Sequence, residues 1–176
     1  MVNEKIYSIL KEKIGDNFIE EKPEELKFID KYYIDNERKK FIFICKVFEN
    51  EQELLDNWEY YQDEEIALAL QNKTFKNDDI RWDMYYLLIY KGDKSIDELK
   101  CYEIERNRFC CKKLIINAQS EVLFRRDIKF KLPLTDIYSS FNGQVDVAND
   151  EYFIEKIIQK SNLDVRKILE LLGYDK

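Results

Sequence analysis

The 176-residue chain contains no histidine, only four glycines and only two prolines. The absence of histidine removes the commonest general base, the Ser-His and Cys-His nucleophile pairs, and nearly every zinc site with nitrogen ligands. With so little glycine, the chain also lacks a P-loop, a GxGxxG motif and a GxSxG motif. We therefore expect no catalytic residues, no cofactor and no bound metal, and we expect that the protein is not an enzyme.

Long apolar runs are also missing. The longest, Met84–Tyr90, has seven residues, whereas about 20 are needed to span a bilayer. The charged N-terminal segment has no apolar core of the kind that signal peptides carry. The sequence thus predicts a cytoplasmic protein that does not enter a membrane.

The four cysteines are expected to be reduced thiols in that compartment. They are Cys45, Cys101, Cys110 and Cys111, and none of them forms a CxxC motif. Because neighbouring side chains on a strand point to opposite faces, Cys110 and Cys111 are not expected to chelate one ion if they lie on a strand. Buried small hydrophobic side chains are the default expectation for these residues.

Hydrophobic residues make up 45% and aromatic residues 14% of the chain, which is enough for a real core in one domain. Periodicity of three and four predicts helices at Asn3–Ile14 and Glu51–Asn72. Runs of aromatic and β-branched residues predict strands at Leu26–Ile34, Lys40–Phe48, Arg81–Tyr90 and Lys113–Ile116. The first two of these strands are expected to form a hairpin, and the second of them is apolar on both alternations, as is typical of an inner strand.

The predicted fold is a single α+β domain over residues 1–176, with a mixed β-sheet flanked by helices. Residues 1–148 form the α/β core in this interpretation, and residues 149–176 form a C-terminal helical segment. A loop is expected at Ser139–Asn149. The stretch before Leu132-Pro133-Leu134 is expected to be extended, and Cys101 could begin either a helix or a strand.

Charge is placed unevenly along the chain, although the net charge of −7 argues against nucleic-acid binding by the molecule as a whole. Residues 49–66 are acidic without any basic residue, and residues 100–131 are mainly basic. An acidic helix face beside a basic strand region is either a solvated surface or a bipolar docking surface that orients a partner. Exposed tyrosines would add anchors of the kind common at interfaces.

One triplet could belong to a metal-dependent nuclease. Asp127-Ile128-Lys129 matches the Asp-x-Lys pattern, in which carboxylates hold the metal and the lysine steadies the attacking water. No convincing partner acid lies on a preceding strand. An alternating strand with a solvated charged face explains the triplet better.

Three stretches, taken in order, resemble a known family. The first is segment 58–62 (WEYYQ), followed by Ile66-Ala67 and Leu70-Gln71, which is similar to a YQ..IA..LQ helix. The second is segment 81–88 (RWDMYYLL), which is similar to a W-N-x-Y-L strand with Asp83 in place of asparagine. The third is segment 104–116 (IERNRFCCKKLII), which is similar to an IE…CRK..I segment with Lys112 in place of arginine, and an LPL follows at 132–134.

These stretches look like the middle component of the bacterial three-component ABC-ATPase systems, the Lamassu-type anti-phage and anti-plasmid defence operons. The likeness covers most of residues 40–135. It implies an accessory, LmuC-like subunit that lies beside an SMC-like coiled-coil ABC ATPase and an effector, often a nuclease. The ATPase would sense foreign DNA, and this subunit would couple it to the effector. The family has no catalytic residues to carry over.

The residues expected to bind a partner come from the helix and from the basic region. They are Trp58, Tyr61, Gln62, Arg106, Arg108, Lys112 and Lys113. The basic residues could meet DNA within the complex or an acidic surface of another subunit. The alternative function is an immunity protein that neutralises a basic toxin by direct binding, because such proteins are also small, acidic and rich in aromatic residues.

Overall fold

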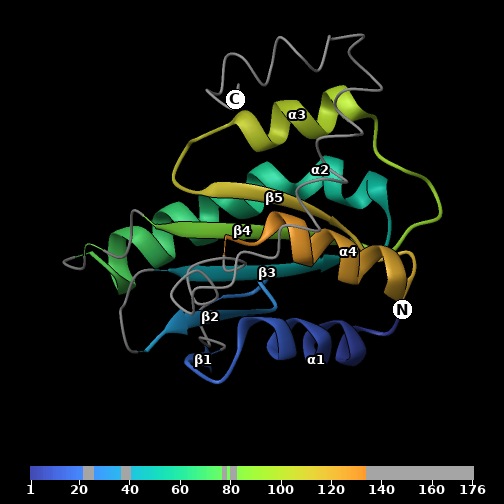
Figure 1. Cartoon of the computed structure of the whole chain (residues 1–176). Helices are drawn as coiled ribbons and strands as arrows, with labels where there is room; N and C mark the ends of the chain where they lie inside the picture. Colours follow the sequence, from blue (N-terminus) through green and yellow to red (C-terminus); the bar gives the residue numbers. More distant parts are fainter. Residues whose placement is uncertain (22–25, 37–40, 77–78, 80–82, 134–176) are drawn as a thin grey trace, which may run out of the picture. The chain divides into compact units, whose positions relative to one another are not determined.

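The strands of the sheet lie in chain order. A computed structural model describes residues 1–21, 26–36, 41–76, 79 and 83–133 (Figure 1). Within these ranges one five-stranded sheet has the order β1-β2-β3-β4-β5. The pairs β1–β2 and β2–β3 are antiparallel, and the pairs β3–β4 and β4–β5 are parallel. The strands are β1 (Phe18–Glu21), β2 (Lys31–Asp35), β3 (Ile42–Phe48), β4 (Met84–Tyr90) and β5 (Lys112–Asn117).

Helices cover both faces of this sheet (Figure 1). Helix α1 (Asn3–Ile14) and helix α4 (Glu121–Lys131) pack on one face. The other face is covered by α2 (Glu51–Tyr61), its π-helical continuation η1 (Gln62–Thr74) and α3 (Glu98–Arg106). Parallel neighbours need a crossover, and α2–η1 connects β3 to β4 while α3 connects β4 to β5. The predicted α+β class with a mixed sheet flanked by helices is confirmed.

The inner strands owe their apolar sequence to burial on both faces. On β3, Ile42 and Ile44 face α2 and η1, while Phe43 and Cys45 face α1 and α4. All four side chains are fully buried. The prediction of an inner strand at this place is confirmed, and so is its antiparallel pairing with the preceding strand.

Two predicted helices are also present. Helix α1 has the predicted bounds, buries Ile6, Ile9, Leu10 and Ile14, and ends at Gly15, whose φ of 89° is accessible to glycine without strain. The long helix begins at Glu51, after Asn50 accepts a hydrogen bond from the backbone N–H of Glu53 (2.8 Å). Its second half is a π-helix, which the sequence pattern does not predict.

The predicted extended stretch before Leu132 is wrong, because residues 121–131 form helix α4. The Ser120 hydroxyl accepts a hydrogen bond from the backbone N–H of Leu123 (3.3 Å) and begins the helix. Phe124 and Ile128, four residues apart, are its buried contacts. Cys101 lies inside helix α3 and not on a strand, and the short edge strand β1 was not predicted.

Charged side chains cover the outer edge of β5. The backbone N–H of Ile115 donates to Glu105 Oε1 (2.9 Å), and its carbonyl accepts from Lys131 Nζ (2.7 Å). The backbone N–H of Asn117 donates to Asp127 Oδ2 (3.0 Å). These side chains from α3 and α4 occupy hydrogen-bonding groups that a further strand would need.

The described residues belong to one compact unit, Met1–Thr135. The loop predicted at Ser139–Asn149 and the helices predicted at 149–176 lie outside the described residues, so the division into 1–148 and 149–176 stays a prediction. No helix in the described part of the chain is both long and apolar enough to cross a membrane.

Candidate functional site

The buried carboxylate of Glu65 joins η1 to the segment that leads into β2. Its Oε1 accepts hydrogen bonds from the backbone N–H groups of Lys27 (2.5 Å) and Phe28 (2.8 Å), and its Oε2 accepts one from Ile29 (2.6 Å). Hydrogen bonds to an ionised acceptor are about twice as strong as neutral ones. Since Glu65 is only 5% exposed, these three bonds fix the segment firmly against the helix.

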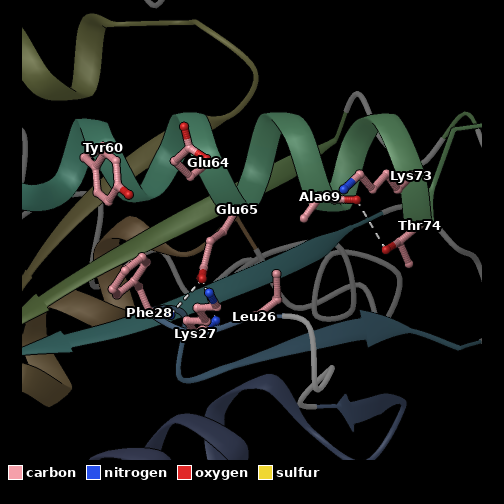
Figure 2. Close-up of a pocket in the computed structure, with 9 residues that line it drawn as sticks. All are labelled: Leu26, Lys27, Phe28, Tyr60, Glu64, Glu65, Ala69, Lys73 and Thr74. Carbon is pink, nitrogen blue, oxygen red and sulfur yellow. Dashed lines mark hydrogen bonds between the residues drawn. The ribbon is translucent and has the colours of Figure 1, made fainter.

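A groove opens between η1 and this segment (Figure 2). Its volume is about 430 Å³. Tyr60 and Phe28 lie toward one end and Lys73 and Thr74 toward the other, while Glu65 points from the helix to the opposite wall (Figure 2). The groove is lined by Leu26, Lys27, Phe28, Tyr60, Glu64, Glu65, Ala69, Lys73 and Thr74.

Aromatic side chains form one end of the groove. The rings of Phe28 and Tyr61 are stacked with centroids 4.6 Å apart, and Tyr60 lies 5.7 Å from Phe28. Tyr60 is 54% exposed. Aromatic residues with one buried and one exposed side are common anchors at protein interfaces. The lining also carries both charge signs, so the groove suits a polypeptide better than a strongly charged polymer.

The π-helix η1 places polar residues inside the core. Gln62 and Gln71, at the two ends of η1, are both buried. Gln62 Nε2 donates to Asp63 Oδ1 (3.1 Å), and Gln71 Nε2 donates to the carbonyl of Cys110 (2.5 Å). The burial of Gln62 agrees with its place in the apolar stripe of the helix. π-Helical segments often occur at functional sites. Here η1 lines the groove and contacts the loop before β5 through the hydrogen bond from Gln71 to Cys110.

Lys113 is the most deeply buried charged side chain in this region, with 1% exposure. Its Nζ donates to the Asn107 carbonyl (3.0 Å), to Asn107 Oδ1 (3.0 Å), to the Phe109 carbonyl (2.7 Å) and to the Cys111 carbonyl (3.1 Å). The loop 107–111 therefore folds around its ammonium group. The same nitrogen lies 6.0 Å from the centroid of the Trp58 ring.

The seven residues predicted to bind a partner do not share one surface. Gln62 and Lys113 are buried, and the structure assigns their side chains to contacts within the chain. Trp58 and Tyr61 are half-buried against the core below α2. Arg106 and Arg108 are exposed. Trp58 and Lys113 are brought together, whereas Tyr61 packs on Phe28, which lines the groove.

Lys112, the seventh of them, is half-buried and paired. Its Nζ lies 3.3 Å from Asp83 Oδ1 and donates to the Tyr85 hydroxyl (3.1 Å). Lys131 is similarly paired with Glu105 (3.0 Å), and Arg125 with Glu121 (2.9 Å). The basic region is thus spread over α3, β5 and α4 and is partly neutralised. A direct partner contact by Trp58, Tyr61, Arg106, Arg108 or Lys112 stays a prediction.

The arrangement around Asp127 does not match the nuclease pattern. Asp127 and Lys129 lie on helix α4 and not on a strand. Asp127 Oδ2 accepts the Asn117 N–H, and its Oδ1 accepts from Arg126 (3.0 Å). Both oxygens are therefore engaged in structural contacts. Among the described residues no cluster of three or more Cys, Asp or Glu side chains could hold a metal ion.

The roles of Glu65 and of the loop around Lys113 do not follow from the sequence pattern. Glu65 is one member of the acidic run at 49–66. Its position next to Ile66, inside the apolar stripe of the helix, was the one available indication of burial. Cys110 and Cys111 do not lie on a strand but in the bend before β5.

The family model for the ABC-three component (ABC-3C) system Middle Component 1 matches residues 41–141. This match covers more than half of the chain and runs from the start of β3 past the end of α4, so it includes η1 and the loop around Lys113. The chain belongs to this family of ABC-3C middle components. No curated protein and no solved structure was found that matches the chain.

Proposed function

We propose that this chain is a non-catalytic accessory subunit that couples an SMC-like ABC ATPase to an effector, often a nuclease, within an anti-phage or anti-plasmid defence complex. The observation that carries the proposal is the family membership of residues 41–141, because a middle component of a three-component system works with other components. The Lamassu-type, LmuC-like role and the cytoplasmic location are supported by the resemblance of the three sequence stretches described above.

We further propose that the groove beside η1 contacts one of these partner subunits. Tyr60 offers an exposed ring at its aromatic end, and Lys27, Glu64 and Lys73 offer charges of both signs along its length. Large aromatic side chains carry much of the binding energy at protein interfaces, and flanking charges fix the register. The three hydrogen bonds to Glu65 keep the groove walls in place before the partner arrives, which reduces the entropy lost on binding.

The test is co-purification of the tagged chain with the products of its neighbouring genes. We expect the ATPase and the effector to be recovered with the native chain. Tyr60→Ala should weaken the retention of one of them by about tenfold or more, the range of an interface hot spot. Tyr102→Ala is the matched control, because Tyr102 is 58% exposed on α3 and lies outside the groove. If both variants retain the partner subunits equally well, the groove is not part of the interface.

The same experiment decides between the accessory role and the immunity protein. Recovery of a single basic toxin in place of an ATPase would overturn the accessory role. The absence of catalysis needs a separate assay, in which the purified chain alone is offered nucleotide and DNA with magnesium or manganese. If the chain turns over either substrate, and a substitution of one of its own acidic residues such as Asp127→Ala abolishes this activity, the proposal of a non-catalytic subunit is overturned.

A further inference from the structure

Cys110 and Cys111 form a close pair of thiols at the end of the loop that surrounds Lys113. Their sulfur atoms are 3.8 Å apart. Cys110 has a φ of 52° and is the one non-glycine residue with positive φ in the described part of the chain. Alternation along a strand would point neighbouring side chains to opposite faces, and the left-handed conformation of Cys110 removes that alternation. The two thiols therefore face each other.

The two cysteines differ in exposure and in electrostatic surroundings. Cys110 is half-buried, and Cys111 is only 4% exposed. The hydrogen bond between the two thiols, together with the nearby Lys113 ammonium group, lowers the pKa of Cys110. The hydrogen bond to Cys110 and burial raise the pKa of Cys111 well above its usual range. Cys110 is thus the more reactive thiolate, and Cys111 is a neighbouring protonated thiol.

We propose that Cys110 and Cys111 are a reversible oxidation site that forms a disulfide between adjacent residues on reaction with a hydroperoxide. The Cys110 thiolate attacks one peroxide oxygen, so an S–O bond forms, the O–O bond breaks, and the leaving hydroxide takes a proton to become water. The Cys111 sulfur then attacks the Cys110 sulfenic acid. An S–S bond forms, the S–O bond breaks, and the hydroxide leaves with the Cys111 proton as a second water. Two thiols lose two electrons, and one hydrogen peroxide becomes two waters.

The position of the pair makes such a bond easy to reduce. Adjacent Cα atoms across a trans peptide are about 3.8 Å apart, which is shorter than the usual span of about 4.4–6.8 Å in disulfides. Strained disulfides have higher reduction potentials and are the labile, regulatory ones. Glutathione or another cellular thiol would therefore restore the dithiol.

Oxidation would also act on η1. Closing the sulfurs from 3.8 Å to the bonding distance of about 2.05 Å moves the peptide between the two cysteines. The Cys110 carbonyl belongs to this peptide and accepts a hydrogen bond from Gln71 on η1. That hydrogen bond would lengthen or break. The same loop presents Phe109, which is 57% exposed, so the oxidised form would offer a different surface to a partner.

The test treats the full chain with hydrogen peroxide, unfolds it, blocks free thiols with iodoacetamide and locates the modified peptides by mass spectrometry. We expect the peptide with Cys110 and Cys111 to lose two hydrogen atoms and to take up no alkyl group, and dithiothreitol to reverse both changes. Cys101, half-buried on α3, is the control within the same molecule and should stay fully alkylated. Alkylation of Cys110 equal to that of Cys101, or direct conversion to sulfinic acid, would overturn the proposal.

Variants separate the two roles. Cys111→Ser should stop the reaction at the Cys110 sulfenic acid, which dimedone traps, whereas Cys110→Ser should give no dimedone adduct at Cys111. A Cys101→Ser variant should behave as the native chain. Hydrogen exchange on the native chain then tests the link to η1, because amides of Gln62–Thr74 should exchange faster after oxidation. Unchanged exchange with the disulfide formed would refute the link, and an adduct at Cys111 would refute the assigned order of attack.

Discussion

Tyr86 on β4 and Lys113 on β5 lie directly opposite each other in the parallel pair, and both side chains are buried below the helix formed by α2 and η1. Ile44 lies opposite Tyr86 on the next strand, and Tyr32 lies opposite Ile44. Polar groups thus enter this face of the core in one row across the sheet. Lys113 has four oxygen acceptors, while the Tyr86 hydroxyl has no hydrogen-bond partner among the described residues.

The Tyr86 hydroxyl should contribute nothing favourable to stability. A buried hydroxyl without a partner costs free energy, so Tyr86→Phe should leave the free energy of unfolding unchanged or raise it by up to about 1 kcal/mol. Tyr32→Phe is the matched control, because the Tyr32 hydroxyl donates to Glu21 on the neighbouring strand. It should lower the free energy of unfolding by about 1 kcal/mol. Urea denaturation of both variants measures the difference, and a larger loss in Tyr86→Phe would contradict the assignment.

Stability should fall at alkaline pH. Burial, followed by the charge of Asp30, raises the pKa of Tyr7, and burial also raises the pKa values of Tyr33 and Tyr86. Above the ordinary tyrosine pKa of about 10, the unfolded chain loses these protons while the folded chain keeps them. The unfolded state then binds fewer protons, so the free energy of unfolding decreases as pH rises. Urea midpoints across this range should show the fall, and Tyr86→Phe should make it shallower.

Glu65 should be among the most sensitive polar positions. Glu65→Gln replaces one acceptor oxygen by an NH₂ group that faces backbone N–H donors, so it should lower the free energy of unfolding by about 2–3 kcal/mol. Glu64→Gln is the control at the adjacent, exposed position and should change it by less than about 0.5 kcal/mol. The measurement is urea denaturation. Hydrogen exchange at the amides of 27–29 should accelerate in Glu65→Gln alone, and equal behaviour of the two variants would contradict the role of Glu65.

How well each helix or strand could be predicted from the sequence depends on the strength of its apolar pattern. Helix α1 has strong apolar periodicity and strand β3 is an almost continuous apolar run, so their existence and their burial follow from the pattern. Helix α4 does not, because its only buried contacts are Phe124 and Ile128, and charged residues alternate with apolar ones around them. Strand β1 has four residues, of which only Phe18 is buried. Where the apolar pattern is this weak, tertiary contacts determine which helix or strand forms.

The site was harder to predict for a different reason. The burial of Gln62 follows from the helical stripe, which the sequence shows. Glu65 binds backbone N–H groups 36 to 38 residues away, and Lys113 binds carbonyls of its own loop. Because these partners are backbone groups, which every residue carries, the residue types in the sequence do not indicate the contacts. The burial of Lys113, which is predicted to bind a partner as part of the basic region, does not follow from its sequence neighbours.

Removal of the side chains that cover β5 should expose a strand edge. In a Glu105→Ala/Lys131→Ala double variant, the N–H and carbonyl of Ile115 lose their side-chain partners, and unpaired edge groups favour pairing with another chain. We expect concentration-dependent association by light scattering. The matched control is Glu103→Ala/Lys129→Ala, which removes exposed charges of the same signs from the same two helices. If both double variants stay equally monomeric, the covering side chains do not protect this edge.

The exposed Arg106 and Arg108 provide the test for DNA contact within the complex. The free chain should bind duplex DNA weakly, since its net charge is −7. In the assembled complex, Arg106→Ala/Arg108→Ala should weaken binding to all sequences alike if the two side chains contact phosphates. The slope of log affinity against log salt should then fall by about 1 for each lost contact. Arg125→Ala is the control, because Arg125 is already paired with Glu121 and Glu12. An unchanged slope in the double variant would assign these arginines to a protein surface instead.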